Sequence, residues 1–158
     1  MYTKQFDIRW RDLDANGHLG NSSYVDFMSH MRMSFFNEIG ISLDLMKKEQ
    51  LGPVVLYEHI HYFKEVLLGK PISVSLEITG MSEDRRFVRF EHNFYDENKK
   101  NLAFSEMLFT WIDLKTRKLA KPDKEISDRI LAFPRASSFK TLLKSDLRKY
   151  NRRPIDLE

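Results

Sequence analysis

Between residues 12 and 24 the chain reads Asp12-Leu13-Asp14-Ala15-Asn16-Gly17-His18-Leu19-Gly20-Asn21-Ser22-Ser23-Tyr24. Two carboxylates, two amides, two glycines and an imidazole are concentrated in this short stretch. Polar side chains and flexible backbone at such density are typical of a loop that binds or transforms a ligand. We therefore expect the functional site here.

An amphipathic helix follows this loop. Apolar residues recur at steps of three and four along one stripe, which comprises Tyr24, Phe27, Met28, Met31, Phe35 and Ile39. This spacing predicts a long helix whose stripe faces the core. Asn21, Ser22 or Ser23 is expected to cap its start, because each side-chain oxygen can accept a free N–H of the first turn. Gly40 is expected to end it.

The remaining segments alternate apolar and polar residues with the period of two that is typical of half-buried strands. A first strand is expected over residues 4–10 and a short helix over 42–50. Four strands joined by short turns are then expected over residues 54–68, 72–79, 87–95 and 102–114, and another short helix after Pro122. Short connections imply antiparallel pairing. A helix of about 16 residues spans roughly 24 Å, a length that one curved sheet can wrap.

Composition and charge divide the chain into two parts. With 158 residues, 42% of them hydrophobic, it is expected to form one globular domain over residues 1–134. Residues 135–158 form a basic tail, expected to be partly helical or extended, with seven Lys/Arg against one acid between residues 135 and 153. A solvated end is the favoured interpretation of this tail, and contact with phosphate or nucleic acid is the alternative.

Several classes of protein are disfavoured. No run approaches the roughly 20 apolar residues of a membrane span, and the N-terminus lacks a signal-peptide core. The chain has no cysteine, which excludes disulfides, thiolate catalysis and cysteine-based zinc sites. These features predict a cytoplasmic protein. His59 and His61 have a spacing that can chelate a metal, but no third ligand is evident, so no metal site is expected.

The loop resembles the signature of the hot-dog thioesterases of the 4-hydroxybenzoyl-CoA thioesterase type. That family reads Asp-x-Asp-x-x-x-His-x-Asn-Asn-x-x-Tyr ahead of its long helix, and often Ile-Asp-Tyr on its second strand. Here Gly20 replaces the first Asn of the pair, and His61 replaces the acid in His59-Ile60-His61-Tyr62. The resemblance continues at residues 114–118. It implies the hot-dog fold, an α+β structure in which a curved antiparallel sheet of about five strands wraps one long central helix.

The resemblance implies hydrolysis of an acyl thioester of coenzyme A or of an acyl-carrier protein. Asp14 is the expected catalytic carboxylate, either as a general base toward water or as a nucleophile that forms a mixed anhydride, and both remain open. The backbone N–H of Asn21 is the expected oxyanion donor, because the first N–H groups of a helix lack intrahelical partners. No cofactor is expected beyond the coenzyme A moiety of the substrate.

The other residues of the loop receive supporting roles. Asp12 is expected to stabilise the loop as an acceptor, and the substrate site is expected to include Gly17, His18, Gly20 and Tyr24. His18 is expected to brace the loop rather than to transfer protons. For Tyr24, packing in the core is at least as plausible as substrate contact.

Arg85 and Arg86 are the expected contacts for the phosphates of coenzyme A, with a solvated turn as an equal alternative. A homodimer or homotetramer is expected, because hot-dog enzymes generally build their site between subunits. The main alternative function is a non-catalytic hot-dog module that binds an acyl chain or coenzyme A. Hydratase or dehydratase activity matches the loop less well, and nucleic-acid binding is least favoured.

Overall fold

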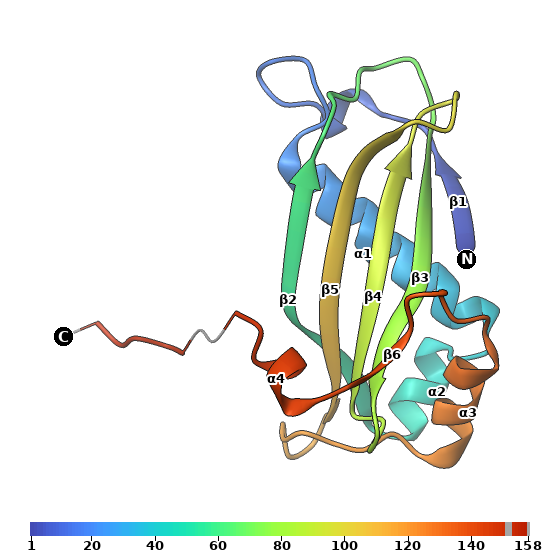
Figure 1. Cartoon of the computed structure of the whole chain (residues 1–158), viewed down its shortest axis with the longest axis vertical. Coiled ribbons are helices and arrows are strands. Elements are labelled where there is room, and N and C mark those ends of the chain that lie inside the picture. The colour runs from blue at the N-terminus through green and yellow to red at the C-terminus, as the bar shows by residue number, and fades with distance from the viewer. Residues whose placement is uncertain (151–152, 158) are drawn as a thin grey trace.

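The computed structural model describes residues 1–150 and 153–157. Figure 1 shows an antiparallel sheet curved around one long helix. Its strands are β1 (Tyr2–Phe6), β2 (Leu51–Tyr62), β3 (Ile72–Ser82), β4 (Phe87–Tyr95) and β5 (Asn101–Asp113), in the order β1-β3-β4-β5-β2. A short strand, β6 (Lys140–Leu142), runs parallel to β3. This is the hot-dog fold that the sequence predicts.

The central helix is α1 (Asn21–Glu38), and its apolar stripe packs against the sheet. Met28, Met31 and Phe35 are fully buried. Fully burying such a side chain is worth about 1.5–3 kcal/mol, so this stripe is a major source of stability. The Phe35 ring meets Phe90 of β4 edge to face, with the ring centroids 5.6 Å apart. Gly40, which has a φ of +78°, follows the helix as expected.

The start of α1 differs from the prediction. The N-cap is Gly20, which has no side chain to bind the first turn, so the predicted cap at Asn21, Ser22 or Ser23 is wrong. The Ser23 hydroxyl instead donates to the backbone oxygen of Asp12 at 2.8 Å. The Ser23 hydroxyl therefore binds Asp12, which lies outside the helix, and does not cap the first turn.

Three strands, β1, β2 and β3, also have clearly different limits than predicted, and β3 continues to Ser82 instead of ending at residue 79. β1 ends at Phe6, and Trp10–Asp12 forms a 3₁₀ turn, because the Asp12 carboxylate binds the N–H of Arg9 at 2.8 Å. β2 ends at Tyr62 and has an irregular register between Val55 and Tyr57. The limits of β4 are confirmed, and those of β5 differ by one residue at each end. The short helices α2 (Leu43–Lys48) and α3 (Lys124–Ala132) are confirmed as well.

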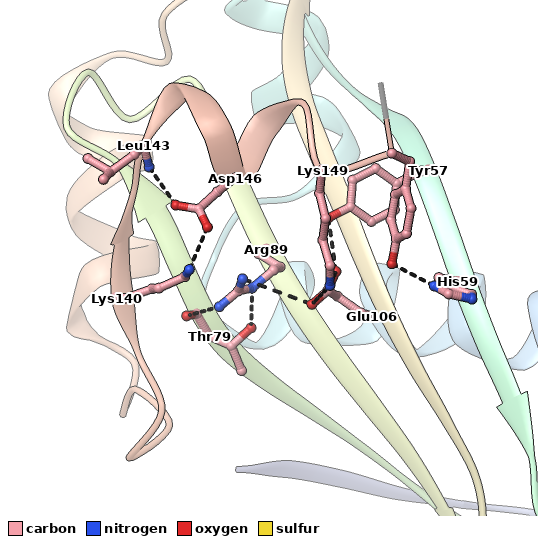
Figure 2. A network of polar contacts seen from close by, with 10 residues as sticks. Tyr57, His59, Thr79, Arg89, Glu106, Lys140, Leu143, Asp146 and Lys149 are labelled. Carbon is pink, nitrogen blue, oxygen red and sulfur yellow. Dashed lines mark hydrogen bonds and ion pairs between the residues drawn. The ribbon is translucent and has the colours of Figure 1, made fainter. Parts of the chain in front are cut away.

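Residues 135–150 cross the outer face of the sheet (Figure 1), with most of their side chains exposed and Leu142 buried. Leu142 of β6 packs directly over Gly80, where a Cβ atom would come within 2.5 Å of the Leu142 Cδ2 atom. After helix α4 (Lys144–Leu147), the Lys149 ammonium binds the Glu106 carboxylate at 3.0 Å. Figure 2 shows Lys149 and Arg89 on either side of this carboxylate. This segment therefore belongs to the folded structure.

Among the helices of the described residues, none is long and apolar enough to cross a membrane.

His92 of β4 is a fully buried histidine within the sheet. Its Nδ1 atom donates to the backbone oxygen of Ser75 at 3.0 Å. Burial, together with the nearby positive charge of Arg32, lowers the pKa of His92 to about 3. The folded protein therefore keeps this imidazole neutral.

We expect His92 to make the fold sensitive to mild acid. In the unfolded chain a histidine gains its proton near pH 6.5, whereas folded His92 stays neutral until about pH 3. Its contribution to stability is therefore complete above pH 6.5 and declines as the pH falls through this window. The variant His92→Leu should show a shallower decline in the free energy of unfolding between pH 6.5 and 4, measured by urea denaturation. An unchanged slope would contradict this origin of the acid sensitivity.

Candidate active site

The loop before α1 holds Asp14 through its own backbone. The Asp14 N–H donates to the His18 carbonyl at 2.8 Å, and the Gly17 N–H donates to the Asp14 carbonyl at 3.0 Å. Gly17 has a φ of +75°, a conformation that favours glycine. The Asp14 Oδ1 atom accepts the N–H groups of Asn16 and His18, at 2.8 and 3.3 Å. Within the described residues Oδ2 has no hydrogen-bond partner, so this exposed carboxylate keeps one oxygen free.

Asp12 connects the loop to the helix. Its carboxylate accepts the Arg9 backbone N–H at 2.8 Å and the Arg9 side-chain Nε and Nη2 groups at 2.9 Å. These bonds hold the pKa of Asp12 below its ordinary value, so its carboxylate stays ionised. The Asp12 backbone oxygen accepts the N–H of Gly20 at 2.9 Å and the Ser23 hydroxyl at 2.8 Å. Asp12 is thus the loop-stabilising acceptor that the sequence predicts.

The first turn of α1 offers unpaired donors. Because Gly20 supplies no cap, the N–H groups of Asn21 and Ser22 have no acceptor in the part of the chain that the structure describes. They lie at the positive end of the helix dipole, which favours a developing negative charge. A Cβ atom on Gly20 would lie 3.7 Å from the Asp14 Cβ atom, an ordinary contact. Gly20, which stands where the family motif has Asn, therefore leaves space next to Asp14, and no steric clash requires a glycine at this position.

A groove of about 380 Å³ runs along this loop. On the loop and helix side it is lined by Asp14, His18, Leu19, Asn21 and Tyr24, and on the other side by Tyr62, Phe63, Lys64 and Glu65. The groove thus brings together the free carboxylate oxygen and the uncapped start of the helix. A carboxylate next to unpaired backbone donors suits addition of water to a carbonyl group, since one group activates the nucleophile and the other binds the oxyanion.

The wall of the groove opposite the loop was not predicted. Glu65 contacts His18, with Oε2 and Nε2 2.9 Å apart, and the Leu19 N–H donates to the Val66 carbonyl at 2.8 Å. These contacts attach the β2–β3 connection to the loop. The only local signal was the charged pair Lys64-Glu65, which interrupts the apolar pattern of the predicted strand.

Two tyrosines line the groove. Tyr24 of α1 meets Tyr62 of β2 edge to face, with the ring centroids 5.0 Å apart, and meets Phe94 at the same distance. Burial raises the pKa of Tyr24 to about 12, so its phenol is neutral at physiological pH. Tyr24 therefore both packs in the core and lines the groove.

Other residues singled out from the sequence lie elsewhere. Arg85 and Arg86 are in the β3–β4 connection, at the end of the sheet away from the groove of the same chain. Arg85 pairs with Asp128 at 3.2 Å and Arg86 with Asp84 at 2.7 Å. The rings of His59 and His61 lie 4.8 Å apart. Among the described residues no three potential ligands are grouped to hold a metal.

Comparison with known proteins places this geometry in context. Residues 8–130 match the family model of the thioesterase-like superfamily. No curated protein matches the chain in sequence.

Solved structures show the same fold at low identity. A hypothetical protein from Staphylococcus aureus, solved in complex with CoA, is 20% identical with a TM-score of 0.77, over 99% of this chain and 94% of that one. A 1,4-dihydroxy-2-naphthoyl-CoA thioesterase from Synechocystis is 17% identical with a TM-score of 0.74, over 83% of this chain and 96% of that one. A hypothetical protein from Aquifex aeolicus is 19% identical with a TM-score of 0.75, over 82% and 98%.

Proposed function

Because the chain belongs to the thioesterase-like superfamily, we propose that it hydrolyses an acyl thioester to a free carboxylic acid and a thiol. One observation carries the proposal: the free oxygen of Asp14 and the uncapped start of α1 share one groove. The motif from Asp12 to Tyr24 favours the 4-hydroxybenzoyl-CoA thioesterase type. The structures solved with CoA, or named as acting on a CoA thioester, favour coenzyme A over a carrier protein.

In the proposed reaction Asp14 provides or activates the nucleophile, and the start of α1 stabilises the oxyanion. The Asp14 carboxylate either takes a proton from an attacking water or itself attacks the thioester carbonyl, giving a mixed anhydride that water then hydrolyses. The Asn21 N–H stabilises the oxyanion that forms in either route. The thiolate departs readily, so the chemistry needs no metal or cofactor. The contact between His18 and Glu65 joins the two sides of the groove.

Replacing Asp14 tests the proposal directly. We expect Asp14→Asn and Asp14→Ala to lower kcat by about 10²–10⁴-fold, the usual contribution of a general base, in assays of thiol release from a panel of acyl-CoAs. Asp26→Asn is the matched control, because Asp26 is an exposed carboxylate near the start of α1 that does not line the groove. Equal rates in all variants would refute the role of Asp14. Binding of acyl-CoA without any turnover would favour a non-catalytic binding module.

Proline at position 21 tests the backbone donor. Asn21 is the first residue of α1, where proline is tolerated, and Gly20 before it is extended with φ −66° and ψ 148°, as a residue before proline requires. Asn21→Pro therefore removes the N–H while it preserves the helix. We expect kcat to fall by about 10²–10³-fold, whereas Asn21→Ala, which keeps the N–H, should lose much less. Equal losses in the two variants would assign the effect to the side chain.

The edge of the sheet supports a homodimer. β2 pairs with β5 on one side, and no described strand pairs with its other side. Its residues Val54, Val55 and Leu56 are exposed, and open apolar edges favour pairing with another chain. We expect sedimentation to give twice the 18.8 kDa of one chain, or four times for a tetramer. Leu56→Lys should shift the protein toward the monomer. The control Leu43→Lys, at an exposed position on α2, should leave the oligomeric state unchanged. A monomeric wild type would contradict the proposal.

A further inference from the structure

A pocket of about 640 Å³, which we call the outer pocket, lies between β2 and the C-terminal part of the chain. On the strand side it is lined by residues 56–59, and on the other side by Leu147, Arg148, Tyr150 and Arg153. No described residue lines both this pocket and the Asp14 groove. Its volume is within the range of about 300–1,000 Å³ that is usual for small-molecule sites.

Three aromatic rings cluster at the outer pocket. Tyr150 meets Tyr57 and His59 edge to face, with the ring centroids 4.9 and 5.1 Å apart. The Tyr150 hydroxyl also lies 2.5 Å from the His59 Nδ1 atom, so a hydrogen bond adds to the ring contacts. Because Tyr150 is still 39% exposed and lines the pocket, the cluster presents ring surface to a ligand.

The ring cluster is anchored to the outer face of the sheet. The Tyr57 phenol donates to the Glu106 Oε1 atom at 3.0 Å, and the Lys149 ammonium binds the same oxygen at 3.0 Å. Figure 2 shows Tyr57 and Lys149 meeting at this carboxylate. Arg89 is also close, with its Nη1 atom 3.9 Å from the Glu106 Oε2 atom. These contacts fix the wall of the pocket and neutralise Glu106 beneath it.

The outer pocket carries an excess of positive charge. Among the described residues that line it, the only carboxylate is Glu58, which forms an ion pair with Arg32 at 2.5 Å. The guanidinium groups of Arg148 and Arg153 have no hydrogen bond or ion pair within residues 1–150 and 153–157. Two cations without a counter-charge therefore remain next to the ring cluster. Guanidinium groups bind phosphate through paired N–H···O bonds, so this charge suits a phosphate group.

We propose that the outer pocket binds a nucleoside phosphate, with the base against the ring cluster and the phosphate between Arg148 and Arg153. Stacking of a base on aromatic rings and binding of phosphate by arginine are the general means of holding such a ligand. The family match ends at residue 130, whereas Leu147, Arg148, Tyr150 and Arg153 all follow it. The site therefore lies outside the region that the chain shares with its family.

The nucleoside phosphate has two possible sources, a free nucleotide or the nucleotide end of an acyl-CoA. His59 lines the outer pocket and Tyr62 lines the Asp14 groove, and these residues are about 10 Å apart along a strand. One acyl-CoA that bends around the end of β2 would therefore reach both sites. In that case the inference also rests on the proposed thioesterase function, whereas a free nucleotide would bind independently of it.

Titration calorimetry of the whole chain with ADP tests the site without turnover. We expect ADP to bind the wild type, and the double variant Arg148→Gln/Arg153→Gln to weaken this binding at least tenfold, because both phosphate contacts lose their charge. Tyr150→Leu should weaken it about tenfold through loss of stacking. Arg135→Gln is the matched control, because it removes the same charge from an exposed C-terminal position outside the pocket, and it should leave the Kd unchanged.

Three results would overturn the proposal. The first is absence of ADP binding to the wild type at millimolar concentration. The second is an equal loss of affinity in Arg135→Gln and in the double arginine variant, which would indicate general attraction of anions to a basic surface. The third is binding of a single-stranded oligonucleotide much more tightly than ADP, which would assign the surface to nucleic acid instead.

The kinetics of hydrolysis separate the two sources of the nucleotide. If it belongs to the substrate, ADP should inhibit acyl-CoA hydrolysis competitively, and the double arginine variant should raise KM about tenfold with little change in kcat. The ratio of kcat/KM for acyl-CoA to that for the matching N-acetylcysteamine thioester, which lacks a nucleotide, should then fall about tenfold. If a free nucleotide is the ligand, the effect of ADP should not be competitive and this ratio should stay unchanged. Either result supports the site and identifies its ligand.

Failure of the outer pocket and failure of the proposed function are distinguishable. Absence of turnover with every thioester would refute the function, while binding of ADP that depends on Arg148 and Arg153 would still support the site. Hydrolysis of acyl-CoA by a wild type that does not bind ADP would overturn the site and leave the function intact.

Discussion

The position of Asp12 is the constraint on which the candidate site depends. Its carboxylate is bound by Arg9, while its backbone oxygen accepts two donors from the first turn of α1, the Gly20 N–H and the Ser23 hydroxyl. These contacts fix where the helix begins and leave its next N–H groups without acceptors. Asp14, two residues later, is held by only one of its two carboxylate oxygens. One carboxylate is therefore used for structure, and the other remains available for chemistry.

The sequence predicted the parts of the fold that local periodicity determines. The stripe from Tyr24 to Phe35 specified α1, and the alternation of apolar and polar residues over 72–79 specified most of β3, because side chains on one face recur with the period of the element. The errors lie where distant backbone groups compete. Ser23 does not cap the helix, since its hydroxyl binds Asp12, and β2 ends early, since Val66 binds the loop instead of continuing a strand. Likewise, Asp14 stood out in its motif, whereas Glu65 could be placed opposite it only by the three-dimensional fold.

Arg32 contributes to two separate features of the structure. It forms a mostly buried ion pair with Glu58 of β2, and its positive charge also contributes to the low pKa of His92. A mostly buried ion pair is a weak source of net stability, because the cost of removing its water offsets the attraction. A change at Arg32 is therefore expected to alter the acid tolerance of the fold.

The C-terminal segment has a practical consequence for where this protein can be divided. The family match stops at residue 130, yet Leu142 fills the space over Gly80 and Lys149 neutralises Glu106 on the outer face. A chain shortened at residue 134 would lose an apolar cover and a counter-charge at the same time. Its outer face would then expose apolar side chains next to the Glu106 carboxylate, which would keep only Arg89 as a cationic neighbour. The shared family region is thus smaller than the unit that folds, and a fragment cut at its boundary would be a poor substitute for the whole chain.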